Sequence, residues 1–286
     1  MDKIFPEKIN NYLELIRINK PIGFMLLLWP CWFSLAYLEF PQQTLISYYV
    51  LFFVGSIIMR SAGCIINDLI DQDIDSKIER TASRPIASKK ITNLNAIIFL
   101  SALLFSGLLI LFQFKFETIL AGLLCTPLIV LYPIMKRITF WPQLFLGIIF
   151  NWGVIICSVE FFGTITNEYL ILYLACVLWT IGYDTIYAYQ DLKDDKKNSI
   201  KSTAVLFEDK GKYLVLTSYT LMFILIGYLS FNQSIEMLKL LVYFSIFIYI
   251  VVNIIRWDNT SEQNSGKKFR QNNLFGAIIF LYLLSF

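Results

Sequence analysis

Two acidic segments carry the residues whose types and spacing point to chemistry. The first reads NDLIDQDID at 67–75 and the second reads DTIYAYQDLKDD at 184–195, and each directly follows a long apolar stretch. Carboxylates gathered in this way repel one another, and a bound cation relieves that repulsion. Because the chain contains no histidine, the donors are hard oxygen atoms, which suit Mg²⁺ together with the phosphate oxygens of a substrate. The two segments therefore predict a metal-bridged phosphate or diphosphate as the ligand.

Helical spacing predicts which of these side chains converge. If each preceding helix runs on through its acidic segment, residues at i, i+4 and i+8, or at i, i+7 and i+11, share one face. The first segment would then present Asn67, Asp71 and Asp75 together, and the second would present Asp184, Asp191 and Asp195. The remaining carboxylates, Asp68, Asp73 and Asp194, are expected to point elsewhere.

A basic residue lies deeper in the apolar stretch that leads to the first segment. Arg60 precedes Asn67 by seven residues, so we expect it on the same helical face. An arginine inside a membrane span costs at least ~2.5 kcal/mol on insertion scales and normally faces a cavity or a partner. Two interpretations of Arg60 stay open: a structural ion pair with Asp184 or another carboxylate, or a contact with an anionic ligand.

A second basic and aromatic cluster consists of Tyr132, Lys136 and Arg137. It lies at the end of another apolar stretch, where positive charges also serve simply as membrane anchors. We weigh a substrate-binding role for these residues against plain anchoring. No Gly-rich phosphate loop competes with this chemistry. The absence of histidine also excludes His-based metal sites and Ser-His-Asp triads.

The composition indicates what must position these residues. The 286 residues are 57% hydrophobic and only 16% charged, whereas soluble domains are about 25% charged. Apolar stretches of about 20 residues, long enough to cross a bilayer, recur along the chain. We expect an all-α polytopic membrane protein, a single integral-membrane domain over residues 1–286. Its nine predicted membrane-spanning helices are 22–40, 46–66, 95–113, 118–135, 140–161, 169–188, 213–233, 238–256 and 271–286.

The positive charges predict how this bundle is oriented. Of the 24 Lys and Arg residues, 21 fall in the amino-terminal segment and the even-numbered loops, which places that side, with both acidic segments, in the cytoplasm. Residues 1–20 are expected to form an amphipathic segment on the cytoplasmic membrane surface. They have no Arg-rich, acid-poor leader pattern, so the expected location is a bacterial inner membrane. The net charge of +3 is too small to indicate nucleic acid as a partner.

The acidic segments also carry a family resemblance. NDLIDQDID, followed by Arg80-Thr81 and Arg84-Pro85, resembles the first aspartate motif, NDxxDxxxD, of the UbiA superfamily of intramembrane aromatic prenyltransferases. Residues 182–205 resemble the second motif, with Asp191 and Asp195 as DxxxD. Three further stretches resemble the branch of that superfamily that prenylates 4-hydroxybenzoate: RINKPIGFMLLLWP at 17–30, YPIMKRITFWPQLFLG at 132–147 and QNNLFG at 271–276.

The resemblance implies a bundle of nine membrane helices around a central cavity that opens laterally to lipid. In that family the two motifs bind Mg²⁺ ions, which hold the diphosphate of a polyprenyl donor. Carried over to this sequence, the implied metal ligands are Asn67, Asp71, Asp75, Asp191 and Asp195. The four aspartates of this set, Asp71, Asp75, Asp191 and Asp195, are also the implied catalytic residues.

The residues and the resemblance agree on a reaction. Diphosphate becomes a good leaving group when fixed positive charge neutralises it, and a phenol ring then attacks the allylic cation ortho to its hydroxyl, in a site closed to water. The expected substrates are a polyprenyl diphosphate and 4-hydroxybenzoate, in a step of ubiquinone biosynthesis, and no obligate protein partner is evident. The acceptor carboxylate is expected at Arg60 or, second, at Arg137. The other predicted substrate-binding residues are Asn67, Tyr132, Lys136 and Asp184.

Three points stay open at this stage. The base that removes the ring proton is a carboxylate of the second segment or the released diphosphate. The acceptor could instead be a naphthoate, homogentisate or haem, as in other branches of the superfamily. An alternative of a different class is a cation-coupled transporter, but such sites usually lie near the bilayer midplane, whereas these carboxylates cluster at one membrane face.

Overall fold

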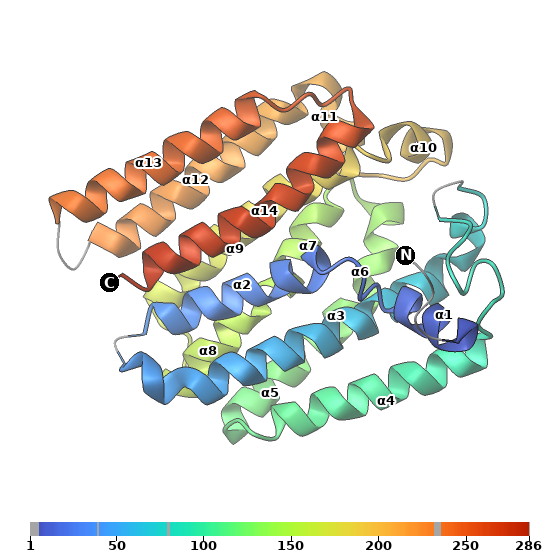
Figure 1. The fold of residues 1–286 in the computed structure, drawn as a ribbon, viewed down its shortest axis with the longest axis horizontal. Helices are drawn as coiled ribbons and strands as arrows, with labels where there is room; N and C mark the ends of the chain where they lie inside the picture. The colour runs from blue at the N-terminus through green and yellow to red at the C-terminus, as the bar shows by residue number, and fades with distance from the viewer. Residues whose placement is uncertain (1–5, 39, 79–80, 232–235, 286) are drawn as a thin grey trace.

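The computed structural model describes residues 6–38, 40–78, 81–231 and 236–285, and within these ranges the chain contains helices and no strands (Figure 1). The prediction of an all-α fold is confirmed. Lys3, Arg80 and the positions 39, 232–233 and 286 of three predicted spans lie outside the described residues. The helices are α1 (Glu7–Leu15), α2 (Ile22–Ala36), η1 (Gln42–Leu45), α3 (Ile46–Asp75), α4 (Asn93–Leu111), α5 (Phe116–Leu124), α6 (Thr126–Ile138), α7 (Pro142–Phe150), α8 (Trp152–Phe162), α9 (Asn167–Ala188), α10 (Leu192–Lys197), α11 (Thr203–Phe207), η2 (Glu208–Lys210), α12 (Gly211–Phe231), α13 (Met237–Ile255) and α14 (Glu262–Leu283).

Each of the nine predicted spans contains helix among its described residues, and seven helical segments in the described part of the chain are long and apolar enough to cross a membrane. These seven are η1 with α3, α4, α5 with α6, α7 with α8, α9, α11 with η2 and α12, and α13. The first and last predicted spans are not among these seven. The helix of the first, α2, has only 15 residues, and the helix of the last, α14, has a polar first half. The chain is thus a multi-span membrane protein, and nine is an approximate count of its spans.

Two of the predicted spans are each made of two helices. The segment 118–135 divides into α5 and α6 at Cys125, two residues before Pro127, whose ring nitrogen cannot donate a helical hydrogen bond. The segment 140–161 divides into α7 and α8 at Asn151, whose amide donates to the Gly147 carbonyl at 2.6 Å. Neighbouring helices satisfy the backbone groups that such breaks free in a membrane.

The bundle is built around α9, the most enclosed of the spans, whereas α4 and α13 lie at its periphery and face outward along most of their length (Figure 1). A buried amide joins three of the inner helices. Trp179 of α9 and Tyr219 of α12 both donate to the side-chain oxygen of Asn272 in α14. Because a buried polar atom without a partner is costly, this contact fixes how the three helices pack.

The first acidic segment forms the last turns of α3, which runs without interruption for 30 residues. A helix of that length is about 45 Å long, well beyond the hydrocarbon thickness of about 30 Å. The prediction that this helix continues through its acidic segment is confirmed. The predicted amphipathic segment includes α1, which packs on the same end of the bundle: Leu15 is buried beside Ile65, and the Tyr12 ring meets that of Phe99 edge-on.

Candidate active site

A cavity of about 1090 Å³ lies inside the bundle, and both acidic segments line it. The polar groups of this cavity lie where α3 and α9 end. Its apolar walls come from the opposite half of α3, from α4 and from α5 through α8, and include Leu51, Phe52, Leu104, Leu111, Leu123 and Trp152. The two acidic segments contribute to the cavity lining the carboxylates of Asp68, Asp75, Asp184, Asp191, Asp194 and Asp195, together with the amide of Asn67. Segments more than a hundred residues apart thus converge on one chamber.

Asp68 and Asp75 share one cation on the cavity side of α3. The guanidinium of Arg84 donates to Asp75 at 2.6 Å and to Asp68 at 3.2 Å, and both carboxylates are almost completely buried. The expectation that Asp68 points away from the site is therefore wrong. Residues seven apart on a helix differ by only roughly 20° around its axis, so Asp68 and Asp75 share a face more closely than either does with Asp71.

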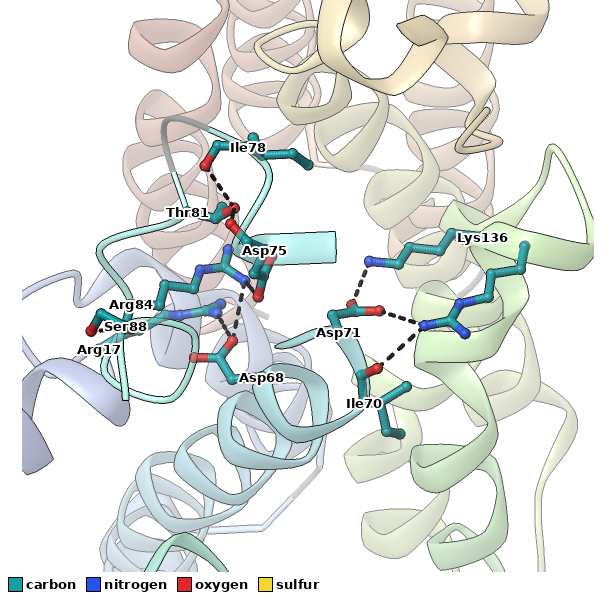
Figure 2. A network of polar contacts seen from close by, with 11 residues as sticks. Arg17, Asp68, Ile70, Asp71, Asp75, Ile78, Thr81, Arg84, Ser88 and Lys136 are labelled. Atoms are coloured by element: carbon teal, nitrogen blue, oxygen red, sulfur yellow. Dashed lines mark hydrogen bonds and ion pairs between the residues drawn. The ribbon is translucent and has the colours of Figure 1, made fainter. Parts of the chain in front are cut away.

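Asp71 turns to the other side of α3, and it is not among the residues that line the cavity. Figure 2 shows its carboxylate directed at Lys136, while Asp68 and Asp75 are directed at Arg84. Lys136 donates to one carboxylate oxygen of Asp71, and Arg137 donates to the other at 3.3 Å. Both cations come from the last turn of α6. Two of the residues predicted to bind substrate thus neutralise a predicted metal ligand.

Arg17, in the turn between α1 and α2, is a second cation on Asp68. Its guanidinium donates to the carboxylate at 2.5 Å, and its φ of 56° is in the left-handed region that non-glycine residues rarely adopt. Burial alone would lower the pKa of Arg17, yet the acidic groups around it, which include Cys64, Asp68 and Asp75, hold that pKa above its ordinary value. Arg17 therefore stays charged at the mouth of the cavity.

The second acidic segment is not a continuation of its span. Helix α9 ends at Ala188, and α10 begins after Asp191, so the single helical face expected for Asp184, Asp191 and Asp195 is wrong. The three carboxylates nevertheless line the same cavity. The new helix places Asp194 and Asp195 in its first turn, where the helix dipole favours negative charge, whereas the end of α9 would disfavour it. This break also turns Asp194 toward the cavity, contrary to expectation.

The loop after α10 connects the second segment to the helix end that holds Asp71. The backbone amide of Lys201 donates to the Lys136 carbonyl at 2.9 Å, and its ammonium donates to the Ile138 carbonyl at 3.0 Å. Next to it, the Ser202 hydroxyl lies 3.5 Å from a carboxylate oxygen of Asp195. The two acidic segments are thus linked through the last turn of α6.

Arg60 lies in the wall of the cavity and has no carboxylate within 4.0 Å among the described residues. The ion pair with Asp184 that was one interpretation of this arginine is therefore not formed at that distance. Its guanidinium carbon lies 5.5 Å from the centre of the Phe150 ring, and a Cβ added to Gly23 would come within 2.7 Å of its Nε. Arg60 is thus held between α2 and α7, beside Tyr132 and Asp184 in the cavity lining.

Sequence reasoning did not assign Arg17, Asp68, Arg84 or Asp194 to this site. Arg84 belongs to the Arg84-Pro85 pair that follows the first aspartate motif, and that pair was the sequence feature that could have assigned Arg84 to the site. Arg17 begins the stretch at 17–30 that resembles the family, but that resemblance did not predict its contact with Asp68. Arg80, the other arginine of that motif, lies outside the described residues.

The donor set fits a hard divalent cation only in part. Within the described residues, no three acidic, cysteine or histidine side chains are grouped closely enough to hold a metal ion by themselves. The carboxylates and the Asn67 amide instead lie around one cavity and supply oxygen donors from different elements. Mg²⁺ usually completes such a set with water and substrate phosphate oxygens. The residues therefore fit a metal that binds together with a phosphorylated ligand.

The fold and the site define a multi-span membrane protein whose cavity joins an acidic, cation-lined mouth to an apolar chamber. The family model of the UbiA prenyltransferase family matches residues 27–282. The chain belongs to this family.

Individual relatives match most of this chain. The chain is 42% identical over 287 residues to an Arabidopsis thaliana protein named 4-hydroxybenzoate polyprenyltransferase, mitochondrial, covering 98% of this chain and 69% of the relative. It is 41% identical over 281 residues to a Drosophila pseudoobscura pseudoobscura protein of the same name, covering 94% of this chain and 68% of the relative. A UbiA homolog from Archaeoglobus fulgidus, solved bound to GPP and Mg²⁺, has the same fold, with a TM-score of 0.69 at 18% identity, covering 96% of this chain and 100% of that chain.

Proposed function

We propose that this protein transfers a polyprenyl group from a polyprenyl diphosphate to the ring carbon ortho to the hydroxyl of 4-hydroxybenzoate, a step of ubiquinone biosynthesis. The observation that carries the proposal is the single cavity, which both acidic segments, several cations and a long apolar wall share. Such a cavity matches a substrate with a charged diphosphate head and an apolar tail. The names of the Arabidopsis and Drosophila relatives support the choice of donor and acceptor.

The reaction balances without a redox partner. The bond between the allylic carbon and the diphosphate oxygen breaks, and its electron pair leaves with the diphosphate. The ring carbon then supplies the electron pair of the new carbon–carbon bond, and the ring proton passes to a carboxylate of the second segment or to the diphosphate. The apolar walls keep water from the cation, which water would otherwise capture.

We propose that the oxygen donors Asn67, Asp71, Asp75, Asp191 and Asp195 hold Mg²⁺. Bound there, Mg²⁺ would supply positive charge to the leaving diphosphate. Asp68 also lines the cavity, which supports adding it to this group of metal ligands. Asp71 would first have to break its ion pairs with Lys136 and Arg137. The cations that now neutralise the carboxylates are placed to bind diphosphate oxygens instead, since arginine and phosphate form strong paired hydrogen bonds.

The acceptor carboxylate is assigned to Arg60, because a cation within a membrane helix that has no carboxylate within 4.0 Å among the described residues favours an anionic ligand. Tyr132, Lys136 and Asp184 line the same cavity, which supports their assignment to the substrate site. Arg137, the second candidate for this carboxylate, is exposed and does not line the cavity, so its pair with Asp71 supports a positioning role.

The decisive experiment incubates the purified protein in detergent with Mg²⁺, a polyprenyl diphosphate and 4-hydroxybenzoate, followed by mass spectrometry. We expect a product heavier than 4-hydroxybenzoate by the polyprenyl group, and none when EDTA replaces Mg²⁺. Naphthoate, homogentisate and haem are offered in parallel, and exclusive use of one of them would replace the acceptor assignment. Substrate flux into vesicles without any product would instead support a transporter.

The setting of this activity is also a proposal. Residues 1–286 are assigned to one domain, because α2, α3 and the helices from α4 to α9 enclose a common cavity. The proposed location is a bacterial inner membrane with the acidic end in the cytoplasm, although the relatives named above carry the word mitochondrial. Cysteine labelling from either side of sealed vesicles, at positions such as Asp73 and Phe116, tests the orientation.

A further inference from the structure

Gly63 lies on the cavity face of α3, between two residues already assigned to the substrate site. It follows Arg60 by three positions and precedes Asn67 by four, spacings that place all three side-chain positions on one helical face. All three line the cavity. A Cβ added to Gly63 would meet nothing within 4 Å. The space that a side chain would fill at this position is therefore open.

The structure gives no packing or backbone reason for a glycine there. Other helical glycines allow close packing: a Cβ at Gly122 would come within 2.8 Å of Leu111, and one at Gly147 within 3.1 Å of Val177. Gly163 needs its left-handed backbone, with φ of 71°. Gly63 shows neither feature. Because glycine inside a helix is less favourable than alanine by roughly 1 kcal/mol, the space itself is the advantage that remains.

Arg60 indicates what the space is for. Its guanidinium is held beside Gly23 and Phe150, and no described carboxylate lies within ion-pair distance of it. Along the axis of α3, Arg60 and Asn67 are separated by roughly 10 Å. An aromatic ring with an anionic group at one end and a hydroxyl at the other is shorter than that distance, but the side chains of Arg60 and Asn67 can extend toward its two ends. The ring would then pass over Gly63.

We propose that Gly63 is a specificity-determining residue that leaves room for the aromatic ring of the acceptor between Arg60 and Asn67. This inference rests on the proposed function, since it assumes an aromatic acid as the second substrate. The acceptor carboxylate lies at Arg60, the ring lies against the bare backbone of α3, and the hydroxyl end is directed to the acidic mouth. Any side chain at position 63 occupies part of the volume that the ring needs.

Two substitutions test this arrangement. Gly63→Ala meets no neighbour, so it should fold and unfold at the wild-type temperature or above. We expect the KM for 4-hydroxybenzoate to rise, because one misplaced methyl group in a tight pocket is worth roughly 10- to 200-fold, while the KM for the polyprenyl diphosphate stays within twofold. Gly63→Leu should abolish acceptor use. Acceptor binding, measured as the rise in unfolding temperature with added 4-hydroxybenzoate, should weaken in the same order.

Gly55→Ala provides the contrast. It adds the same methyl group to the same helix and the same cavity, where its nearest neighbour would be Ile110 at 3.9 Å. Two turns deeper, among apolar side chains, it should alter the KM for the donor and not that for the acceptor. Wild-type acceptor KM and acceptor binding in both Gly63 variants would overturn the inference. A wild-type protein that forms no prenylated aromatic product would instead overturn the proposed function. The Gly63 and Gly55 variants are therefore compared only with wild-type protein that is active.

Discussion

Arg84 donates a hydrogen bond to Asp75 at 2.6 Å, from a loop that folds back over the end of α3 (Figure 2). The loop is itself held there, because the Thr81 hydroxyl donates to the Asp75 carbonyl at 2.9 Å and the Arg84 amide donates to the Thr81 carbonyl. Arg84 also reaches Asp68. The site therefore balances its buried carboxylates with its own cations, and a metal ion and a diphosphate must exchange with these pairs.

The first prediction concerns this exchange. Arg84→Ala should leave Asp75 buried without its cation, which is strongly destabilising for a paired buried charge. The unfolding temperature without Mg²⁺ should therefore fall. Because Mg²⁺ can replace the lost positive charge, it should raise the unfolding temperature of Arg84→Ala by more than that of the wild type. Thermal unfolding in detergent, with EDTA or with Mg²⁺, measures both quantities.

Arg84→Lys is the matched control for charge. It keeps a cation near Asp75 but cannot bridge two carboxylates as the planar guanidinium does. We expect an intermediate unfolding temperature and an intermediate response to Mg²⁺. An equal Mg²⁺ response in the wild type and in Arg84→Ala would show that metal and arginine do not compete for the same carboxylates.

The second prediction separates two aspartates of the proposed metal site from an exposed one. Asp71→Asn and Asp191→Asn should each lower turnover by at least roughly 100-fold, since each removes negative charge from the proposed metal site. Asp73→Asn changes a carboxylate of the same segment that is exposed and does not line the cavity, so its turnover should stay within twofold of the wild type. Asparagine is preferred to alanine at position 71 because it keeps the volume beside Lys136. Near-normal Mg²⁺-dependent turnover of both Asp71→Asn and Asp191→Asn would remove these residues from the site.

The sequence predicted which helices form this site better than it predicted which of their residues face the cavity. Apolar length and helical period located α3 and its acidic end, because α3 continues as a regular helix through Asp75. The same reasoning failed for Asp184 and Asp191, because α9 ends at Ala188. No proline or glycine marks that end. It is fixed by contacts with later residues, namely the hydrogen bond between the Thr185 and Thr203 hydroxyls and the one from Tyr189 to the Glu208 carbonyl.

The cations of the site were predicted least well. The pair of Arg17 and Asp68 joins residues 51 positions apart and depends on a left-handed backbone at Arg17, which no local pattern indicates. Asp68 was assigned to the wrong side because helical spacing was judged from Asn67 rather than from Asp75. Tertiary contacts between loops decide such pairs, so they became visible only in the folded chain.

The third prediction concerns the acceptor carboxylate. Arg60→Gln removes the cation but keeps a polar side chain of similar length beside Phe150. The KM for 4-hydroxybenzoate should rise by at least roughly tenfold, because a hydrogen bond to a charged group is worth about 1.5–3 kcal/mol. The KM for 4-hydroxybenzamide, which carries no carboxylate, should change far less. Equal losses with both acceptors would instead assign Arg60 to the donor or to the packing of the bundle.

The fourth prediction addresses how Arg60 is positioned. A Cβ at Gly23 would lie 2.7 Å from Nε of Arg60 and 3.3 Å from one of its terminal nitrogens. Gly23→Ala should therefore displace the guanidinium, which can move at little cost because it ends a flexible side chain. We expect a higher acceptor KM with an unchanged unfolding temperature. In an Arg60→Gln background the same substitution should have a smaller effect on acceptor KM. Full additivity in the double variant would show that Gly23 acts independently of Arg60.

The last prediction concerns a buried carboxylate far from the acidic mouth. Glu160 of α8 accepts hydrogen bonds from the Tyr48 hydroxyl at 3.0 Å, the Lys115 amide at 3.0 Å and the Thr118 hydroxyl at 2.8 Å. It therefore joins α3, α5 and α8 at the end of the bundle opposite the site, and it does not line the cavity. Glu160→Ala leaves three donors without their acceptor, which costs about 1–3 kcal/mol for each group that stays buried and unpaired. The unfolding temperature should fall, while the acceptor KM and the Mg²⁺ requirement of the folded fraction stay at wild-type values. Glu160→Gln can still accept from the Lys115 amide, so it should lose less stability. A changed acceptor KM in either variant would show that this end of the bundle is coupled to the acceptor site.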